Sequence, residues 1–251
     1  MKLNLATLFT YRVNLVNNIL ASIGWGAMSL LSVIILTSRI TSAYGWSREE
    51  LLLFNGIYGM IVGVFHMFIS VNMGRLSRVI HMGELDGILT KPIDSQFAVS
   101  LWQINFATVF RILMATTFTV WVIRSLHIVV SPLAFITFFL SSIASILLLY
   151  SLWFIILTNL IWYTNLSNLV LFMYSFESMA RFPKEMLAQL SGFIFAVVFP
   201  LSLVINTPAR ILIGKMNIGD SLMLLMLSGG FWVISRMYWK FALRHYTSAS
   251  S

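Results

Sequence analysis

Long apolar runs, separated by short polar stretches, dominate the chain. A membrane-spanning helix needs about 20 largely apolar residues. Six runs reach or approach this length, at 19–37, 51–73, 97–123, 132–158, 160–176 and 221–238. We therefore predict an all-α polytopic membrane protein with six transmembrane helices, and a single transmembrane domain over residues 1–251.

A further apolar stretch, 184–213, is too long for one span and is interrupted by prolines. A straight helix of this length would reach ~45 Å, whereas Pro200 and Pro208 each remove a backbone donor and clash with the preceding turn. We predict re-entrant half-helices between spans five and six, with Pro200 near the tip. A rival topology keeps 160–184 in the cytoplasm and uses 185–206 as the fifth span. The positive-inside rule favours the rival, because it places ten Lys/Arg inside and five outside, against eight and seven.

Composition agrees with a membrane protein and excludes several classes of activity. Of 251 residues, 59% are hydrophobic and 10% are charged, whereas soluble domains carry about 25% charged residues. The net charge of +8 fits cationic loops that face anionic lipid headgroups rather than nucleic acid. The chain has no cysteine, no phosphate-binding G-x-x-x-x-G-K-[ST] and no H-E-x-x-H. We predict a protein that is not itself an enzyme, with no catalytic, cofactor or metal residues.

The segment 74–96 is the most polar part of the chain between two apolar runs. Its apolar residues recur at helical spacing in two groups, Leu76, Val79 and Ile80, then Leu85, Ile88 and Leu89. Gly83 permits a bend between the groups, and Lys91-Pro92 ends the second. We predict a short amphipathic helix pair along the cytoplasmic surface. The residues on its water face are Glu84, Asp86 and Lys91. The spacing alone leaves two interpretations open, a docking surface and a solvated loop without a partner.

Short motifs along the chain carry a resemblance to a known family. In the loop they are Gly83-Glu84-Leu85-Asp86, Leu89, Lys91-Pro92-Ile93 and Phe97. Elsewhere they are Tyr11-Arg12 with Asn14, Gly45-Trp46-Ser47 with Glu49-Glu50, Arg181-Phe182-Pro183, and Pro200, Pro208-Ala209, Leu212 and Gly214. Together they resemble the type-2 permeases of ABC transporters, and in particular the branch of six-span half-permeases of roughly 250 residues.

The resemblance implies a permease of an ATP-driven exporter whose first cytoplasmic loop docks in a cleft of a separate ATPase subunit. The expected docking residues are Arg78, Gly83, Glu84, Leu85, Asp86, Lys91 and Pro92. The resemblance also implies half-helices on the outer side between spans five and six. ATP and Mg²⁺ would bind the partner subunit and not this chain.

The same resemblance sets the expected partners and location. A second permease, identical or homologous, completes the pathway, since one six-span domain supplies half. We expect a multi-pass protein of a bacterial plasma membrane, with both termini cytoplasmic. Two alternatives stay open, an ion-gradient-driven secondary transporter and a non-transporting membrane scaffold. The scarcity of intramembrane carboxylates disfavours the first.

Four residues within apolar runs are candidates for a pathway or gate, namely Arg111, His66, Glu177 and Pro200. A charge at bilayer depth costs at least ~2.5–3.5 kcal/mol on insertion scales. Arg111 is either a pathway or interface cation or a side chain that snorkels to the headgroups. His66 is either a proton-linked gate or a neutral partner for another helix. Glu177 is either paired with Arg181 one helical turn on or placed in an outer vestibule.

Three local features complete the prediction. Ser47 and Glu50 have the spacing of a capping box before span two. Gly59 and Gly63 suit close helix packing. The re-entrant layout gathers four cations into a basic rim at the outer mouth, Arg181, Lys184, Arg210 and Lys215.

Overall fold

The computed structural model describes residues 12–163 and 168–246, and these are almost entirely helical. The elements in chain order are α2 (Arg12–Thr37), β1 (Ser42–Ala43), β2 (Trp46–Ser47), α3 (Arg48–Phe65), the π-helical turn η1 (His66–Ser70), α4 (Val71–His81), α5 (Leu85–Leu89), α6 (Ser95–Ser100), α7 (Thr108–Ser125), α8 (Pro132–Thr158), the 3-10 turn η2 (Asn159–Ile161), α9 (Leu169–Ser178), the 3-10 turn η3 (Met179–Arg181), α10 (Lys184–Leu187), α11 (Gly192–Leu212) and α12 (Ile218–Leu243). Tyr11 and the side chains of Arg12 and Asn14, named in a motif above, lie outside the described part.

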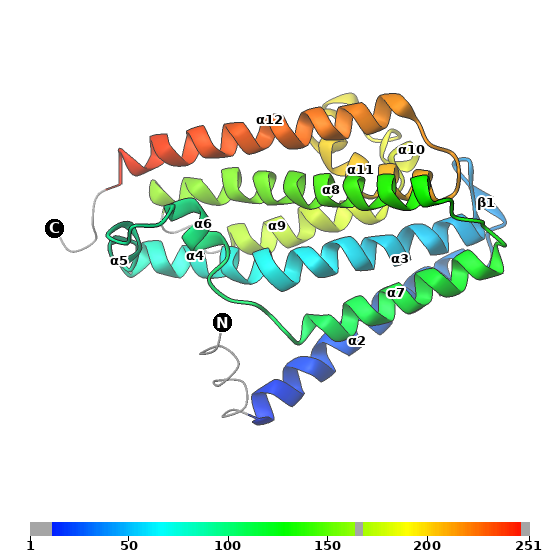
Figure 1. The fold of residues 1–251 in the computed structure, drawn as a ribbon, viewed down its shortest axis with the longest axis horizontal. Helices are drawn as coiled ribbons and strands as arrows, with labels where there is room; N and C mark the ends of the chain where they lie inside the picture. The colour runs from blue at the N-terminus through cyan, green and yellow to red at the C-terminus, as the bar shows by residue number, and fades with distance from the viewer. Residues whose placement is uncertain (1–11, 164–167, 247–251) are drawn as a thin grey trace.

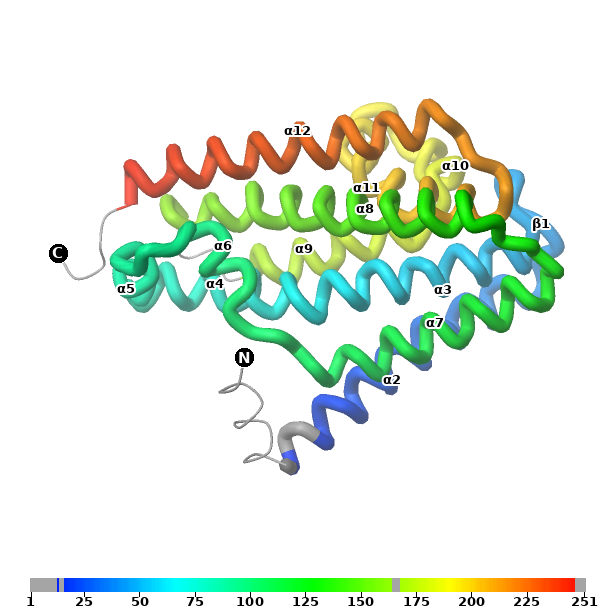
Figure 2. Tube along the Cα trace, viewed as in Figure 1, coloured from blue at the N-terminus to red at the C-terminus, as the bar shows by residue number. Residues whose placement is uncertain are grey.

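The helices form an elongated bundle with two distinct ends (Figure 1). α12, α8 and α3 run along its length, α12 packs on α8, and α8 also contacts α11 and α3. α7 packs on α3 and α2, and the α2–α7 pair diverges from the other helices where α7 begins (Figure 2). We call the end with α5 and α6 the loop end, and the end with the β1–β2 hairpin the hairpin end. The first described turns of α2 and the last turn of α12 both lie toward the loop end.

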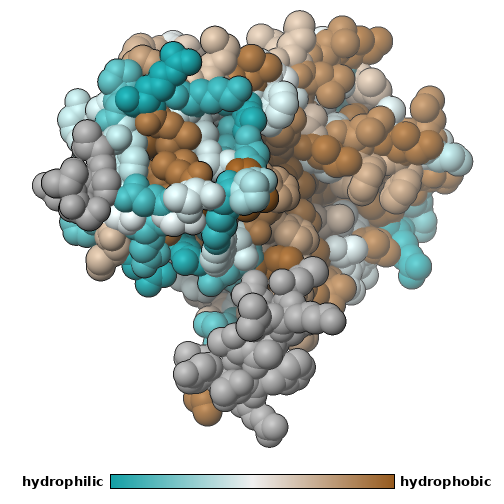
Figure 3. Space-filling view, turned by 60° about the vertical axis from the view of Figure 1, so that its left-hand side comes forward, coloured by the Kyte–Doolittle hydropathy of each residue, from teal (hydrophilic) through white to brown (hydrophobic). Residues whose placement is uncertain are grey.

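The surface has the pattern of a protein embedded in a membrane. Hydrophilic residues gather over the loop end, and hydrophobic residues cover the sides of the helices (Figure 3). In residues 12–163 and 168–246, five helical segments are long and apolar enough to cross a membrane, at 16–37, 48–81, 132–161, 192–212 and 218–243. Four correspond to predicted spans one, two, four and six, which confirms an all-α polytopic protein. In predicted spans three and five, α7 has 18 residues and α9 has 10, so the count of six stays a prediction.

Predicted span three is not one continuous helix. It divides into α6 and α7, joined by the irregular segment 101–107. Asn72 of α4 holds this segment, because its Nδ2 donates to Gln103 O at 2.9 Å and its Oδ1 accepts from Gln103 N at 2.8 Å. Asn105 N donates to Met67 O, a carbonyl of η1, at 2.9 Å. Irregular backbone is tolerated where its polar groups are paired in this way.

The stretch 184–213 returns to the end at which it starts, but it is not a pair of half-helices. Glu185 of α10 bonds to Arg210 in the last turn of α11 at 2.7 Å, so both ends of the stretch lie together at the hairpin end. α10 is a single turn, whereas α11 has 21 residues, or about 31 Å. Pro200 lies inside α11 and not at the tip of a re-entrant loop.

A neighbouring helix explains how α11 continues through a proline. Pro208 has no N–H, so the carbonyl of Val204 loses its helical donor. Ser145 Oγ of α8 donates to that carbonyl at 2.6 Å. A hydrogen bond from a packed helix therefore replaces the missing bond, as in other membrane helices that contain proline.

The path of the chain before α11 disagrees with the rival topology. α9 runs from the loop-end half of the bundle toward the hairpin end (Figure 1). Beyond η3, Lys184 pairs with Asp220 at the start of α12. Lys184 thus lies at the opposite end of the bundle from α5, whereas the rival needs both on one side of the membrane.

Two local predictions about α3 are confirmed. Ser47 Oγ accepts from Glu50 N at 3.2 Å, and Glu50 Oε2 accepts from Ser47 N at 3.0 Å, which completes the capping box. Gly59 and Gly63 face α7. A Cβ at Gly59 would lie 2.8 Å from the Ala115 side chain, and one at Gly63 would lie 2.7 Å from Ile112. The missing side chains therefore allow α3 and α7 to approach closely.

Candidate functional site

The loop end holds the segment predicted to dock on a partner. α4 continues the axis of α3 as far as His81, so the predicted surface helix pair is wrong in its first half, and only α5 is a separate helix. The reason is packing, since Leu76, Val79 and Ile80 are buried against the bundle and an unbroken helix keeps them there. Gly83 turns the chain with φ 70°, a left-handed conformation that glycine adopts readily. The predicted bend is thus confirmed.

The tip of the loop presents charged and apolar side chains together. Leu85 and Ile88 are buried and fix α5 to the bundle, whereas Met82 is 65% exposed and Ile93 is 52% exposed. Of the predicted docking residues, those with exposed side chains are Arg78, Glu84, Lys91 and Pro92, and Asp86 is half-buried. The tip therefore combines exposed charged side chains with two exposed apolar ones. The sequence reasoning missed Met82, and used Ile93 only in a motif.

Aromatic and ionic contacts hold this loop against the bundle. Lys91 Nζ lies 4.4 Å from the centroid of a Trp102 ring, and Arg75 Cζ lies 5.1 Å from one. Arg75 also pairs with Glu84 at 3.8 Å. Such contacts are worth about 0.5–1 kcal/mol each at exposed sites. Lys91 and Glu84 therefore position the loop in addition to facing outward.

A second connection ties the loop to α12. Asp94 caps α6, because its Oδ1 accepts from Phe97 N at 2.9 Å. Arg236 of α12 donates to both Asp94 carboxylate oxygens at 2.7 Å. These hydrogen bonds hold the pKa of Asp94 at about 2. Because this pKa is depressed, the link is fully present above the ordinary carboxyl pKa of about 4 and is lost as the pH falls through about 2. The sequence offered one signal for it, an aspartate just before a short helical run.

A polar cluster in the middle of the bundle joins three of the predicted pathway residues. His66 starts η1, and its Nε2 lies 2.8 Å from Glu177 Oε1 of α9. Its Nδ1 lies 2.8 Å from Arg111 Nη2 of α7. A guanidinium can only donate, so Nδ1 accepts and the ring proton lies on Nε2, which donates to Glu177. His66 is thus a neutral bridge between a cation and an anion on two other helices.

The contacts of this cluster show where the Arg111 and Glu177 side chains lie. Arg111 points inward to His66 and does not snorkel. Glu177 is 2% exposed and has His66 as its partner, while Arg181 lies over the ring of Tyr58 at 5.3 Å. Within the described residues, Glu177 Oε2 and Arg111 Nε have no hydrogen-bond partner. π-helical turns often occur at functional sites, and η1 begins at the histidine that holds the cluster together.

Three of the four cations predicted to form a basic rim lie at the hairpin end, and each of them is paired with an acid; the fourth, Arg181, lies over Tyr58 of α3. The ion pairs are Lys184–Asp220, Arg210–Glu185 at 2.7 Å and Lys215–Glu50 at 2.7 Å. Glu185 also accepts from Trp46 Nε1 at 2.9 Å. These pairs join α10 to α11 and α12, and join the loop 213–217 to α3. The cations therefore stabilise the hairpin end and do not form an open anion site.

Comparison with known proteins gives one match. The model of a family described as ABC-2 family transporter protein matches residues 23–250. No curated protein and no solved structure matches the chain. The matched region contains the loop end, the cluster of Arg111, His66 and Glu177, and the ion pairs at the hairpin end.

Proposed function

Because the chain belongs to the ABC-2 family of transporter proteins and is a multi-pass membrane permease, we propose that it forms the substrate pathway of an ATP-driven exporter. In this proposal a separate ABC ATPase subunit holds ATP and Mg²⁺, and two permeases assemble with two ATPases. The loop end faces the cytoplasm of a bacterial cell, together with both termini.

The exposed tip around α5 and its rigid connections carry this proposal. The helix from Arg48 to His81 extends over 34 residues, so a displacement at Gly83 is transmitted along it to His66. The Asp94–Arg236 link connects the same loop to α12. ATP binding would close the ATPases and favour the permease state that fits the closed form, which is a shift between two populations. The loop thus contacts two candidate spans through which such a shift can reach the pathway.

The buried cluster favours a second candidate function. Intramembrane carboxylates and histidines are typical of proton relays in transporters driven by ion gradients, and Glu177 and His66 are bonded to each other. A secondary transporter would need no ATPase partner, so the two candidates differ in composition as well as in energy source.

Purification from the native membrane tests the choice. The tagged chain should be isolated in mild detergent and weighed intact by native mass spectrometry. We expect a complex with equal numbers of permease and nucleotide-binding subunits, whose ATP hydrolysis is inhibited by vanadate. Purified permease that transports along an ion gradient without such a subunit would contradict the exporter proposal and support the second candidate.

Cysteine labelling tests the orientation, since the chain contains no cysteine. Single cysteines at positions 184 and 215 should both react with a membrane-impermeant maleimide added to intact cells, because Lys184 and Lys215 lie at the same end of the bundle. A cysteine at position 78 is the control and should react only after permeabilisation. Reaction of position 184 from the cytoplasmic side alone would contradict this layout.

A further inference from the structure

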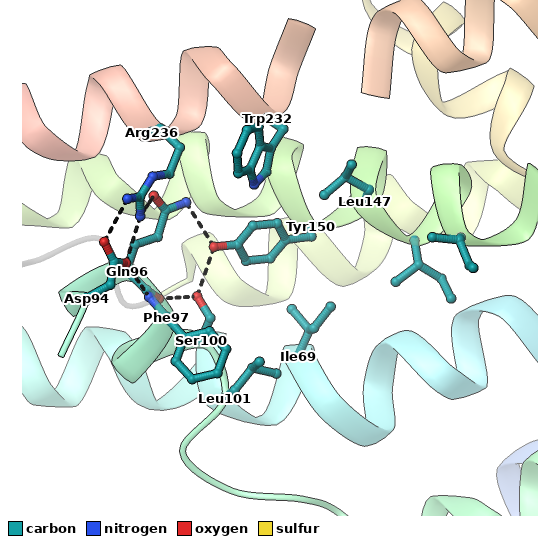
Figure 4. A pocket seen from close by; sticks show the side chains of 12 residues that line it. Ile69, Asp94, Gln96, Phe97, Ser100, Leu101, Leu147, Tyr150, Trp232 and Arg236 are labelled. Atoms are coloured by element: carbon teal, nitrogen blue, oxygen red, sulfur yellow. Dashed lines mark hydrogen bonds and ion pairs between the residues drawn. The ribbon is translucent and has the colours of Figure 1, made fainter. Parts of the chain in front are cut away.

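A cavity of about 480 Å³ opens on the side of the bundle near the loop end (Figure 4). This volume lies within the ~300–1,000 Å³ typical of small-molecule sites. α6, α8, α12 and Ile69 of η1 form its walls. The apolar residues that line it are Ile69, Phe97, Leu101, Ile143, Ile146, Leu147 and Trp232.

The cavity is polar at one end and apolar along the rest of its length. Its polar end lies toward the loop end, where Arg236, Asp94, Gln96, Ser100 and Tyr150 form a hydrogen-bonded network (Figure 4). Tyr150 Oη accepts from Gln96 Nε2 at 2.9 Å. Ser100 Oγ donates to Gln96 O at 2.6 Å, so Tyr150 Oη donates in turn to Ser100 Oγ at 3.0 Å. Each of these five side chains has a hydrogen-bond partner within the network. The only cation of the network, Arg236, forms an ion pair with Asp94.

The cavity extends from the loop end, where its polar residues lie, along α8 and α12 toward the middle of these candidate spans. The side chains of Asp94 and Arg236 are 44% and 31% exposed, as expected at the boundary between water and lipid. Trp232 lies one helical turn deeper than Arg236, and Ile143 lies about 10 Å deeper than Tyr150 along α8 at ~1.5 Å per residue. Trp232 is 44% exposed and Ile143 is 50% exposed. Both lie on candidate spans, so in a membrane an opening between them faces hydrocarbon wherever no partner chain covers it.

We propose that this cavity binds one acyl chain of a bilayer phospholipid, with the lipid headgroup beside Arg236 and Asp94. An apolar slot that opens sideways into the membrane is filled most favourably by hydrocarbon, at about 25 cal/mol per Å² of apolar surface buried. The satisfied polar end leaves no isolated charge that demands an ionic ligand inside the cavity. A lipid held here contacts α6, α8 and α12 at once, beside the link between the loop and α12. The inference requires only that the chain lies in a membrane, and it does not depend on the proposed exporter function.

Photolabelling in a defined bilayer tests the proposal. The purified chain should be placed in nanodiscs of phosphatidylcholine that contain a trace of phosphatidylcholine with a diazirine on one acyl chain. Because no other hydrophobic molecule is present, any label comes from a bilayer lipid. We expect the labelled peptides to centre on Leu101, Ile143, Leu147 and Trp232.

Substitutions that fill the cavity provide the decisive comparison. Leu147→Trp and, as a second blocking variant at a more exposed position, Ile143→Trp should each lower labelling of the Leu101 and Trp232 peptides about tenfold, which corresponds to ~1.4 kcal/mol. The matched control is Leu140→Trp, since Leu140 is 56% exposed on α8 and does not line the cavity. It should leave that labelling unchanged. Labelling spread evenly along the exposed face of α8, or unchanged in a monodisperse blocking variant, would overturn the proposal.

Discussion

Replacing Gly83 with proline should lower ATP-driven transport at least tenfold while the chain still inserts into the membrane. Gly83 has φ 70°, and its N–H donates to Ile80 O at 3.2 Å. Proline fixes φ near −65° and has no N–H, so it cannot form this turn and α5 cannot keep its place. We expect turnover by the reconstituted permease–ATPase complex to fall at least tenfold, the effect of about 1.4 kcal/mol.

Gly83→Asn is the matched control for this loop. Asparagine tolerates the left-handed region far better than other side chains and keeps its N–H, so this variant should retain most of the activity. Equal amounts of both variants in the membrane fraction would show that insertion is not the cause. Full transport by Gly83→Pro would mean that the loop is dispensable, which contradicts the proposed coupling.

Glu177→Gln should destabilise the protein more than any neutralisation of an exposed acid. The glutamine can still accept from His66 Nε2, but Arg111 then lacks its buried counter-charge. Arg111 and Glu177 are joined through the neutral His66 and not in direct contact, so we expect a loss of about 1–3 kcal/mol, as for a buried polar group that loses its partner. Surface substitutions usually stay within about 0.5 kcal/mol. Glu49→Gln at the exposed start of α3 is the matched control. Thermal unfolding of the detergent-solubilised chain, followed by fluorescence-detected size exclusion, measures both.

Removing the cation together with the anion distinguishes a charge effect from a packing effect. In Arg111→Met/Glu177→Gln no charge of the pair remains, so we expect more than half of the lost stability to return. Additive losses in the double variant, or a loss for Glu177→Gln no larger than for Glu49→Gln, would show that the Arg111–His66–Glu177 cluster does not act as one unit.

The features that the sequence predicted depend on neighbouring residues along the chain. The capping box of Ser47 and Glu50, the turn at Gly83 and the end of α5 before Pro92 are all local, and the structure confirms them. The packing face at Gly59 and Gly63 is also local, although its partner helix α7 could not be named from the spacing.

The features that it missed depend on contacts between distant segments. α11 passes through Pro208 because Ser145, far earlier in the chain, supplies a hydrogen bond to Val204 O. Predicted span three divides because Asn72 pairs with the backbone of Gln103. Hydropathy records neither contact, so from the sequence alone a proline resembles a tip and an apolar run resembles a continuous helix.

In the candidate site, too, the unusual residues could be identified from the sequence, whereas their contacts with distant segments could not. His66, Arg111 and Glu177 are each unusual within an apolar run, yet no local pattern indicates that three helices bring them together. Lys184, Arg210 and Lys215 lie together at one end as predicted, whereas spacing does not reveal their acidic partners. Lys215 and Glu50 show why, because they pair across most of the length of the chain.

Photo-crosslinking from the loop tip tests most directly whether this loop docks on an ATPase. A benzoylphenylalanine at position 82 replaces an exposed methionine at the tip, and one at position 44 replaces an exposed tyrosine in the hairpin at the other end. After irradiation of native membranes, position 82 should yield a crosslinked product that contains a nucleotide-binding ABC subunit, and position 44 should not. Absence of such a subunit at position 82, in a variant that retains transport, would contradict the account.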